Sequence, residues 1–191
     1  GLDLPVEAVL RQVAESAELL GEVLPPKPRR VVVAGMARTF QNIRLFASLT
    51  ALENVMLPLE LADRRDARPL ATDMLARVGL DRAAEREAGN LSYGALKRLE
   101  IARALHRQSR ILVMDEPTAA LSSRETQRLF DLILRLRDEG MAIIYISHRM
   151  GDIRRLADRI VAMRDGAISG RFERAPLDIE SAVRAMLGHA M

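Results

Sequence analysis

The sequence predicts an α/β fold in which a mainly parallel sheet is joined to a helical subdomain. Residues 111–115 and 142–146 are almost entirely apolar, as parallel strands covered on both faces usually are. A segment with helical periodicity precedes each of them, and this alternation is typical of parallel α/β sheets. Asp115 and Glu116 stand at the end of the first strand, where open α/β sheets place their ligands.

Residues 1–30 are expected to form an N-terminal helix and a Pro-rich linker of unknown role. Apolar residues recur at spacings of four and three from Val6 to Leu24, which predicts an amphipathic helix. The prolines of residues 25–28 end that helix and stiffen the chain after it. The main domain is therefore placed at 31–191.

Helices are predicted over much of the region that follows Gln41. The stretch up to Asn54 mixes apolar anchors with polar residues and looks partly helical. A second helix is predicted to begin near Pro69, because proline is favoured in the first turn of a helix. A third helix is predicted at 92–107. We therefore expect a helical subdomain at about 42–105.

The C-terminal half is predicted to alternate helices with strands. The helices have amphipathic periodicity and are placed at 123–138, 152–157 and 178–187. Ser122 and Glu125 have the spacing of a capping box for the first of these helices. A strand at 160–164 is expected in the same parallel core, and Asp165-Gly166 after it marks a tight hairpin.

Composition narrows the possible partners and compartments. Twenty-nine basic residues oppose 26 acidic ones, for a net charge of +3, which does not require nucleic acid as a partner. Cysteine is absent, which excludes disulfides and thiolate metal sites. No apolar stretch approaches the roughly 20 residues of a membrane span, and no signal-peptide pattern opens the chain. We expect a cytoplasmic protein, which includes a peripheral subunit of a membrane complex.

The acidic pair after the first strand has the chemistry of phosphoryl transfer. That reaction needs a hard cation on the phosphates and a group that orients the attacking water. Asp115 suits the cation through magnesium-bound water, and Glu116 suits the water as general base. An alternative interpretation is an acidic pair that only caps a turn. Pro117-Thr118 and the segment at 91–105 favour the phosphoryl-transfer interpretation.

A second candidate is the turn Ser92-Tyr93-Gly94, which opens a helix. Backbone amides at a helix N-terminus bind anions readily. Ser92 adds a hydroxyl, and Gly94 permits close backbone approach. Ser92 is alternatively a plain N-cap, and both roles are compatible.

A histidine follows the second buried strand. A lone histidine is more often structural, but the position of His148 after Ser147, at a carboxyl end beside the acidic pair, favours contact with a terminal phosphate. Adjacent parallel strands lie about 4.8 Å apart. We therefore expect Glu116 and His148 on one surface within about 10 Å, with Gln41 nearby.

These motifs together resemble the nucleotide-binding subunit of an ABC transporter, over about residues 34–188. Residues 37–46, ARTFQNIRLF, resemble the Q-loop of branched-chain amino acid importers. Residues 91–105, LSYGALKRLEIARAL, resemble the signature helix of the same group. From Glu116 onward the likeness shifts, because YISHRM at 145–150 and RDG at 164–166 resemble sugar importer ATPases.

The resemblance implies a P-loop NTPase-like fold with ATP and Mg²⁺ as cofactors. It places a Walker B and switch region at about 108–170 and a C-terminal helix at about 178–188. Asp115 would hold magnesium through water, with Gln41 sensing both the magnesium and the γ-phosphate. Glu116 would polarise the attacking water, and His148 would contact the γ-phosphate. The implied nucleotide-binding residues of the signature turn are Ser92, Tyr93, Gly94 and Ala95.

The chain also departs from the family pattern. No G-x-x-x-x-G-K-[ST] motif occurs, so the phosphate loop is missing from this sequence. The phosphate-loop strand and the N-terminal antiparallel β subdomain are expected to be missing with it, and no aromatic residue precedes Phe40 to stack on adenine. Ala95 replaces the usual glutamine of the signature, and Ser122 replaces a frequent aspartate.

Three functions fit these observations. The first is an ATP-hydrolysing subunit of an ABC importer for branched-chain amino acids or sugars. The second is a non-hydrolytic subunit that offers only its signature turn to a partner's ATP site. The third, an ABC-type ATPase of DNA repair or translation, is disfavoured because the stretch from Gln41 to Leu91 is too short for a long coiled coil.

The partners implied are ABC permease membrane subunits and a second ATPase subunit, identical or different, with no nucleic acid. A groove between 42–60 and the helix near 69–78 is expected to receive a permease helix. The protein would then sit peripherally on the inner face of the cell membrane.

Overall fold

The computed structural model describes residues 36–39, 43–61, 64–105, 110–173 and 177–188. The helix and linker predicted at 1–30, and Gln41, lie outside the described residues. The chain divides into two compact units, of which one spans Gly35–Ser147 and the other includes His148–Met191.

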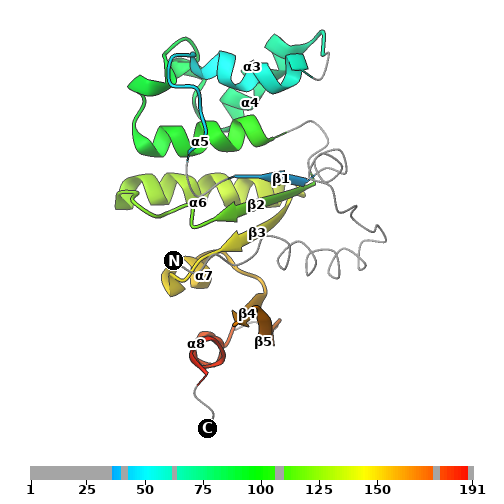
Figure 1. The fold of residues 1–191 in the computed structure, drawn as a ribbon, viewed down its shortest axis with the longest axis vertical. Helices are drawn as coiled ribbons and strands as arrows, with labels where there is room; N and C mark the ends of the chain where they lie inside the picture. The colour runs from blue at the N-terminus through cyan, green and yellow to red at the C-terminus, as the bar shows by residue number, and fades with distance from the viewer. Residues whose placement is uncertain (1–35, 40–42, 62–63, 106–109, 174–176, 189–191) are drawn as a thin grey trace. The chain divides into compact units, whose positions relative to one another are not determined.

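The sheet of the Gly35–Ser147 unit is parallel and has the order β1–β2–β3 (Figure 1). Its strands are β1 (Met36–Arg38), β2 (Ile111–Asp115) and β3 (Ala142–Ile146). In the register of the sheet, Ala37 lies opposite Leu112, and Leu112 lies opposite Ile143. The predicted parallel pairing of 111–115 with 142–146 is therefore confirmed.

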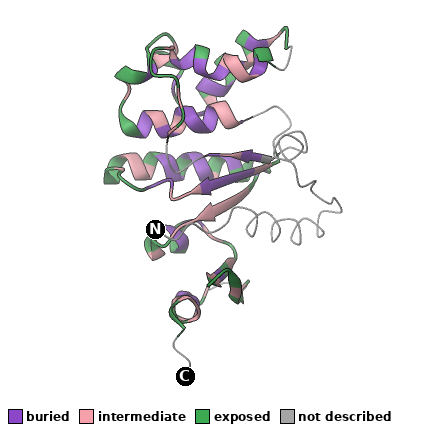
Figure 2. Cartoon of the chain, viewed as in Figure 1, coloured by how far each residue is buried: buried purple, intermediate pink, exposed green. Residues whose placement is uncertain are grey.

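Burial differs between the two predicted strands (Figure 2). Leu112, Val113 and Met114 of the central β2 are buried, whereas residues 143–146 of β3 are only half-buried. β3 is an edge of the sheet among the described strands, so it has fewer neighbours to cover it. The apolar sequence predicts that both faces of each strand are buried, and this holds for β2 but only partly for β3.

Three helices form a layer in this unit, at the top of Figure 1. They are α3 (Ala51–Leu61), α4 (Ala67–Arg77) and α5 (Tyr93–Ala104). α3 packs against α4 and α5, and α5 also contacts β1 and α6. Short 3₁₀ turns at Asp81–Ala83 and Ala88–Asn90 connect α4 to α5. The buried side chains Val55, Leu75 and Leu99 belong one to each helix, so the apolar faces meet in a common core.

α6 (Ser123–Asp138) contacts both α5 and β3. The capping box predicted for Ser122 and Glu125 is present at its N-terminus. Gly140, just beyond its C-terminus, has φ +93°, a conformation that glycine adopts without steric cost. The buried face of α6 consists of Leu129, Phe130, Leu132, Ile133 and Leu136.

The unit that includes His148–Met191 contains α7 (Met150–Leu156) and a β-hairpin covered by a helix. β4 (Ile160–Arg164) pairs antiparallel with β5 (Ala167–Phe172). α8 (Ile179–Leu187) packs across both strands and begins after the capping residue Asp178. Among the described helices of the chain, none combines the length and the apolarity that a membrane crossing requires.

The prediction that 160–164 joins the parallel core is wrong. β4 belongs to a two-stranded antiparallel sheet of its own. Asp165 and Gly166 both have positive φ, +51° and +78°, as the central residues of a type I′ hairpin turn do. The turn brings β5 beside β4 at once, whereas a parallel partner needs a long crossover. An apolar run alone does not distinguish these two partners.

Candidate functional site

The acidic pair lies at the carboxyl ends of two adjacent strands. β2 ends at Asp115, and the Glu116 backbone N–H donates to the Ile146 carbonyl at 2.9 Å. The Ser147 hydroxyl donates to Glu116 Oε2 at 3.3 Å. The Glu116 side chain is therefore held beside the end of β3, and both carboxylates are only half-buried.

Glu116 has an unusual backbone. Its φ is +44°, in the left-handed region that residues with a side chain rarely occupy. Such positions cluster at functional sites, where the surrounding structure holds the strain. Because glycine would fit this backbone better, the presence of a glutamate there supports a role for its carboxylate.

Asp115 faces a cation from the neighbouring strand. Arg38 Nη2 lies 3.9 Å from Asp115 Oδ2, and Arg38 is the last residue of β1. Within the described ranges, no three His, Cys, Asp or Glu side chains gather into a group that would hold a metal ion alone. A site with one or two carboxylates fits magnesium when substrate phosphates supply further oxygens, so the Asp115–Glu116 pair is compatible with Mg²⁺ bound to a nucleotide.

The signature turn has the local structure that its sequence predicts. Ser92 is the N-cap of α5, and its Oγ accepts from the Ala95 N–H at 3.3 Å. Gly94 and Ala95 are buried, whereas Tyr93 is exposed. The capping role of Ser92 is confirmed. Because the Ser92 hydroxyl also donates to Glu125 Oε1 at 3.3 Å, capping does not use up its hydrogen-bonding capacity.

Glu125 connects the signature turn to α6. Its Oε1 accepts from the Gly94 N–H at 3.1 Å, and its Oε2 accepts from the Ser122 hydroxyl at 2.7 Å. Hydrogen bonds, first that from the Ser122 side chain, lower the pKa of Glu125 below its ordinary value. The sequence indicated only the capping contact with Ser122. The contact with Gly94 joins residues 31 positions apart, so no local spacing could have indicated it.

Asn54 organises the segment that leads from β1 into the helical layer. The Asn54 side chain is buried, and its Oδ1 accepts from the Phe46 N–H at 2.9 Å. Its Nδ2 donates to the carbonyls of Phe46, Leu49 and Thr50 at 3.0–3.2 Å. Sequence reasoning missed this residue, although an asparagine between the apolar Leu52 and Val55 is a recognisable signal of a buried amide.

Arg103 fixes the same segment from α5. Its guanidinium donates to the carbonyl oxygen of Arg44. Burial lowers the pKa of Arg103. Arg44, which lies within the predicted Q-loop segment 37–46, is therefore attached directly to the signature helix.

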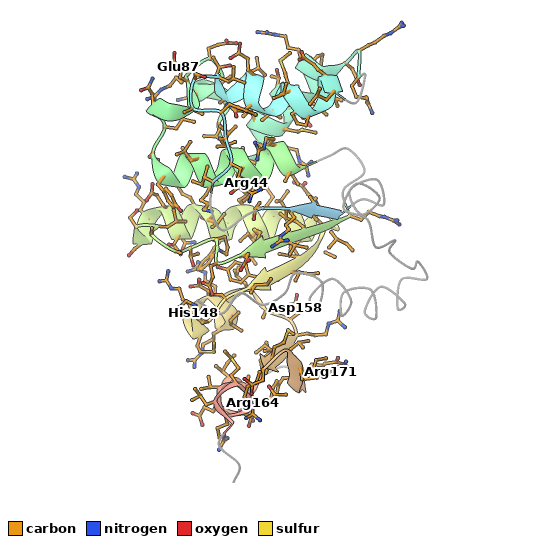
Figure 3. All side chains as sticks on the ribbon, viewed as in Figure 1. Arg44, Glu87, His148, Asp158, Arg164 and Arg171 are labelled. Carbon is orange, nitrogen blue, oxygen red and sulfur yellow. The ribbon has the colours of Figure 1, made fainter. Side chains whose placement is uncertain are left out.

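The predicted cluster of Glu116, His148 and Gln41 stays a prediction. Gln41 lies outside the described residues. His148 is exposed and begins the other compact unit (Figure 3). The contacts among Ser92, Gly94 and Glu125, by contrast, all lie within the Gly35–Ser147 unit.

Comparison with known proteins decides the family. Residues 8–119 match the family model described as ABC transporter. This chain belongs to the ABC transporter family. The match begins at residue 8, earlier than the resemblance read from the motifs, which starts at about residue 34. Part of the segment at 1–30 is thus included in the ABC transporter match.

The ABC transporter relatives include proteins named for ribose import. The ribose import ATP-binding protein RbsA of Yersinia pestis is 45% identical over 184 residues, covering 92% of this chain and 36% of the relative. Ribose import ATP-binding protein RbsA 2 of Escherichia coli O157:H7 is 44% identical over 186 residues, covering 93% and 37%. The chain therefore spans little more than a third of the length of these relatives, and the likeness to sugar importers is confirmed.

Solved ABC cassettes share the fold. MJ1267, an ATP-binding cassette of an ABC transporter in its ADP conformation, has a TM-score of 0.71 at 24% identity, covering 85% of this chain and 72% of that one. The dimeric cassette MJ0796, bound to ADP and Pi, has a TM-score of 0.66 at 28% identity, covering 79% and 69%. The predicted ABC ATPase fold is confirmed.

Proposed function

We propose that this chain is part of the ATP-binding subunit of an ABC importer that takes up a sugar, and that its residues help to hydrolyse ATP. The observation that carries the proposal is Glu116, a carboxylate held at φ +44° beside Asp115 at the carboxyl end of a parallel sheet. The names of the ribose import relatives favour a sugar, of the ribose type, over a branched-chain amino acid.

Each candidate residue has a defined part in this proposal. Glu116 orients and deprotonates the water that attacks the γ-phosphate, and its bond from Ser147 keeps the carboxylate in place. Asp115, with Gln41, holds magnesium through water. When bound, the magnesium ion neutralises charge on the phosphates. His148, which follows Ser147 in the sequence, is proposed to contact the γ-phosphate.

The signature turn serves a nucleotide held by another cassette. Ser92 and Gly94 offer a hydroxyl and a backbone N–H at the positive end of α5. We propose that these donors contact the γ-phosphate of an ATP bound mainly by a second ATPase subunit, with Tyr93 and Ala95 completing the turn. The dimeric arrangement of the similar cassette MJ0796 supports a second subunit.

The permease is proposed to dock on the helical layer, on the inner face of the membrane. Phe46 is 52% exposed and Leu61 is 81% exposed, although both are large apolar side chains. Exposed apolar side chains of this kind suit a helix of a membrane subunit. A pocket on α4 lies in the same unit, and charged and apolar side chains line it in equal number, namely Asp66, Asp73 and Arg77 with Pro69, Leu70 and Met74.

Sugar uptake in cells tests the proposal. Glu116→Gln, introduced into the gene that encodes this chain, keeps the size of the side chain but removes the base. We expect uptake of labelled ribose to fall about 100-fold or more. Glu85→Gln is the matched control, because Glu85 is an exposed carboxylate paired with Arg68 on the surface, and it should leave uptake unchanged. Normal ribose uptake by Glu116→Gln cells with normal protein amounts would contradict the proposed hydrolytic role. Loss of leucine uptake instead of ribose uptake would overturn the assignment to sugars.

A further inference from the structure

We propose that the Glu125 carboxylate acts as an internal latch, occupying the phosphate-binding donors of the signature turn until an incoming γ-phosphate displaces it. This inference rests on the proposed function, since it assumes that Ser92 and Gly94 bind a phosphate. It adds a residue of this chain that competes for the same donors. The latch is defined as the two contacts of Glu125 Oε1, with Ser92 Oγ at 3.3 Å and with the Gly94 N–H at 3.1 Å.

The latch joins two helix N-termini through one carboxylate. Ser92 caps α5 and Ser122 caps α6, and each hydroxyl donates to a different oxygen of Glu125. The positive ends of two helix dipoles therefore meet at one negative charge. A carboxylate in this position satisfies the same donors that would otherwise attract an external anion.

The absence of a side chain at Gly94 allows the Glu125 carboxylate to approach the backbone closely. A Cβ atom placed on Gly94 would lie 2.6 Å from Glu125 Oε1 and 2.8 Å from its Cδ. These separations are far below van der Waals contact, so any side chain at position 94 would push the carboxylate away. The close approach that the sequence analysis assigned to a phosphate is made here by a side chain of the same chain.

Two anions cannot use these donors together. A γ-phosphate at Ser92 Oγ and the Gly94 N–H would lie within a few ångströms of Oε1, where like charges repel strongly. The contacts of Oε2 with the Ser122 hydroxyl and N–H, at 2.7 and 3.1 Å, belong to the capping box of α6. The side chain can therefore release Oε1 while Oε2 continues to cap α6.

The charges around the latch keep it closed in the absence of a nucleotide. Arg98 of α5 interacts electrostatically with Glu125 and with Arg128 of α6. Hydrogen bonding to Ser122, Gly94 and Ser92 lowers the pKa of Glu125, so the carboxylate is charged at neutral pH. An anion that opens the latch then gains the same two donors and the same positive surroundings.

Nuclear magnetic resonance of the 191-residue chain tests the latch directly. Glu125→Gln is the informative variant, because glutamine also completes a capping box but carries no charge. We expect the Gly94 amide proton to lose its downfield shift in Glu125→Gln and to keep it in the control Glu85→Gln. Tripolyphosphate should shift the Gly94 amide at about tenfold lower concentration in Glu125→Gln than in the unmodified chain, as expected when a charge-assisted hydrogen bond no longer competes. An unchanged Gly94 amide, or equal tripolyphosphate dependence in both proteins, would overturn the proposal.

A second measurement separates the latch from the proposed function. In membranes that carry the assembled importer, Glu125→Gln should lower the ATP concentration for half-maximal uptake several-fold without reducing maximal uptake. A fall in maximal uptake by a normally folded Glu125→Gln protein would mean that Glu125 positions the turn productively, and the latch would be rejected. Normal uptake by Glu116→Gln contradicts the proposed hydrolytic role, whatever the resonance of Gly94 shows.

Discussion

Glu116 adopts a backbone conformation that glycine tolerates better than any residue with a Cβ atom. At φ +44°, an alanine keeps the steric strain and loses the bond from Ser147, whereas a glycine relieves the strain. We expect Glu116→Gly to be more stable than Glu116→Ala by about 1 kcal/mol. Urea denaturation of the two variants measures the difference.

A matched pair at Glu139 provides the control. Glu139 is the C-cap of α6 and has φ −76°, so alanine carries no left-handed penalty there. Glu139→Ala should be at least as stable as Glu139→Gly. If alanine were also preferred at position 116, the backbone at Glu116 would not be strained.

Asn54 is expected to contribute strongly to stability. Asn54→Ala removes the four hydrogen bonds of a buried amide and leaves the Phe46 N–H without this acceptor. The three carbonyls that Asn54 contacts keep backbone donors. Since a hydrogen bond contributes about 0.5–1.5 kcal/mol, we expect a loss of about 2–4 kcal/mol in the free energy of unfolding. The control is Asn90→Ala at an exposed position, which should cost less than about 1 kcal/mol. Equal losses would contradict the organising role of Asn54.

Among single residues, the sequence predicts the roles of side chains whose partners lie nearby in the chain. Ser92 and Ser122 are recognisable as helix caps because the backbone N–H groups that donate to their hydroxyl oxygens lie three residues further along. The bonds of Arg103 to Arg44 and of Glu125 to Gly94 join residues 59 and 31 positions apart. Their partners are backbone atoms whose location depends on the packing of elements, which residue spacing does not encode.

Among the elements, α6 was predicted with the bounds that the structure shows, 123–138. Both of its ends carry chemical signals, the capping box at Ser122 and the left-handed Gly140. β4 was located correctly but assigned to the wrong sheet. A strand can pair antiparallel with the next strand through a hairpin or parallel with a distant strand through a crossover. The apolar pattern of the strand itself is the same in both cases, so it does not predict the partner.

The helix caps predict how stability depends on pH. Glu53 at α3, Glu125 at α6 and Asp178 at α8 have pKa values lowered by hydrogen bonds, first those from Thr50, Ser122 and Ser181 respectively. A lowered pKa in the folded state stabilises the protein above the ordinary values of 4.5 and 3.8. This stabilisation should be lost as pH falls through the lower folded values.

Urea midpoints measured from pH 6 to pH 3 check this expectation. They should decline below about pH 4.5, and the decline should be shallower in the variant with Glu53→Gln, Glu125→Gln and Asp178→Asn together. The three amide side chains of that variant can still cap their helices, but they have no carboxyl group that titrates. Stability that rises on acidification would contradict the assignment.

For the whole molecule, the parallel core and the family were predictable because several motifs occur in a fixed order along the chain. The acidic pair lies at the sheet end where the sequence placed it, and the signature turn opens α5 as expected. The contact of the Glu125 carboxylate with that turn was not predictable, because it requires α5 and α6 to be packed against each other.

Nucleotide binding by the isolated 191-residue chain is expected to be very weak. The sequence has no G-x-x-x-x-G-K-[ST] motif, whose amides and lysine normally hold the β- and γ-phosphates. Charge-assisted hydrogen bonds contribute about 1.5–3 kcal/mol each, so the loss of three or four costs several decades of affinity. Titration calorimetry with Mg-ATP should show a dissociation constant above about 1 mM. Micromolar binding that depends on Asp115 would contradict this expectation and reveal another phosphate site.

The parallel pairing of β1 with β2 has a consequence for how the chain acquires its structure. Thr39 donates its N–H to the Val113 carbonyl at 2.9 Å, across a separation of 74 residues, and the whole helical layer lies between them. On the ribosome, β1 therefore emerges long before its partner strand has been synthesised. Contacts within the layer are short in sequence and form quickly. An early helical layer would shorten the effective loop that β1 and β2 must close, so the nascent chain would complete its sheet only after the three helices have packed.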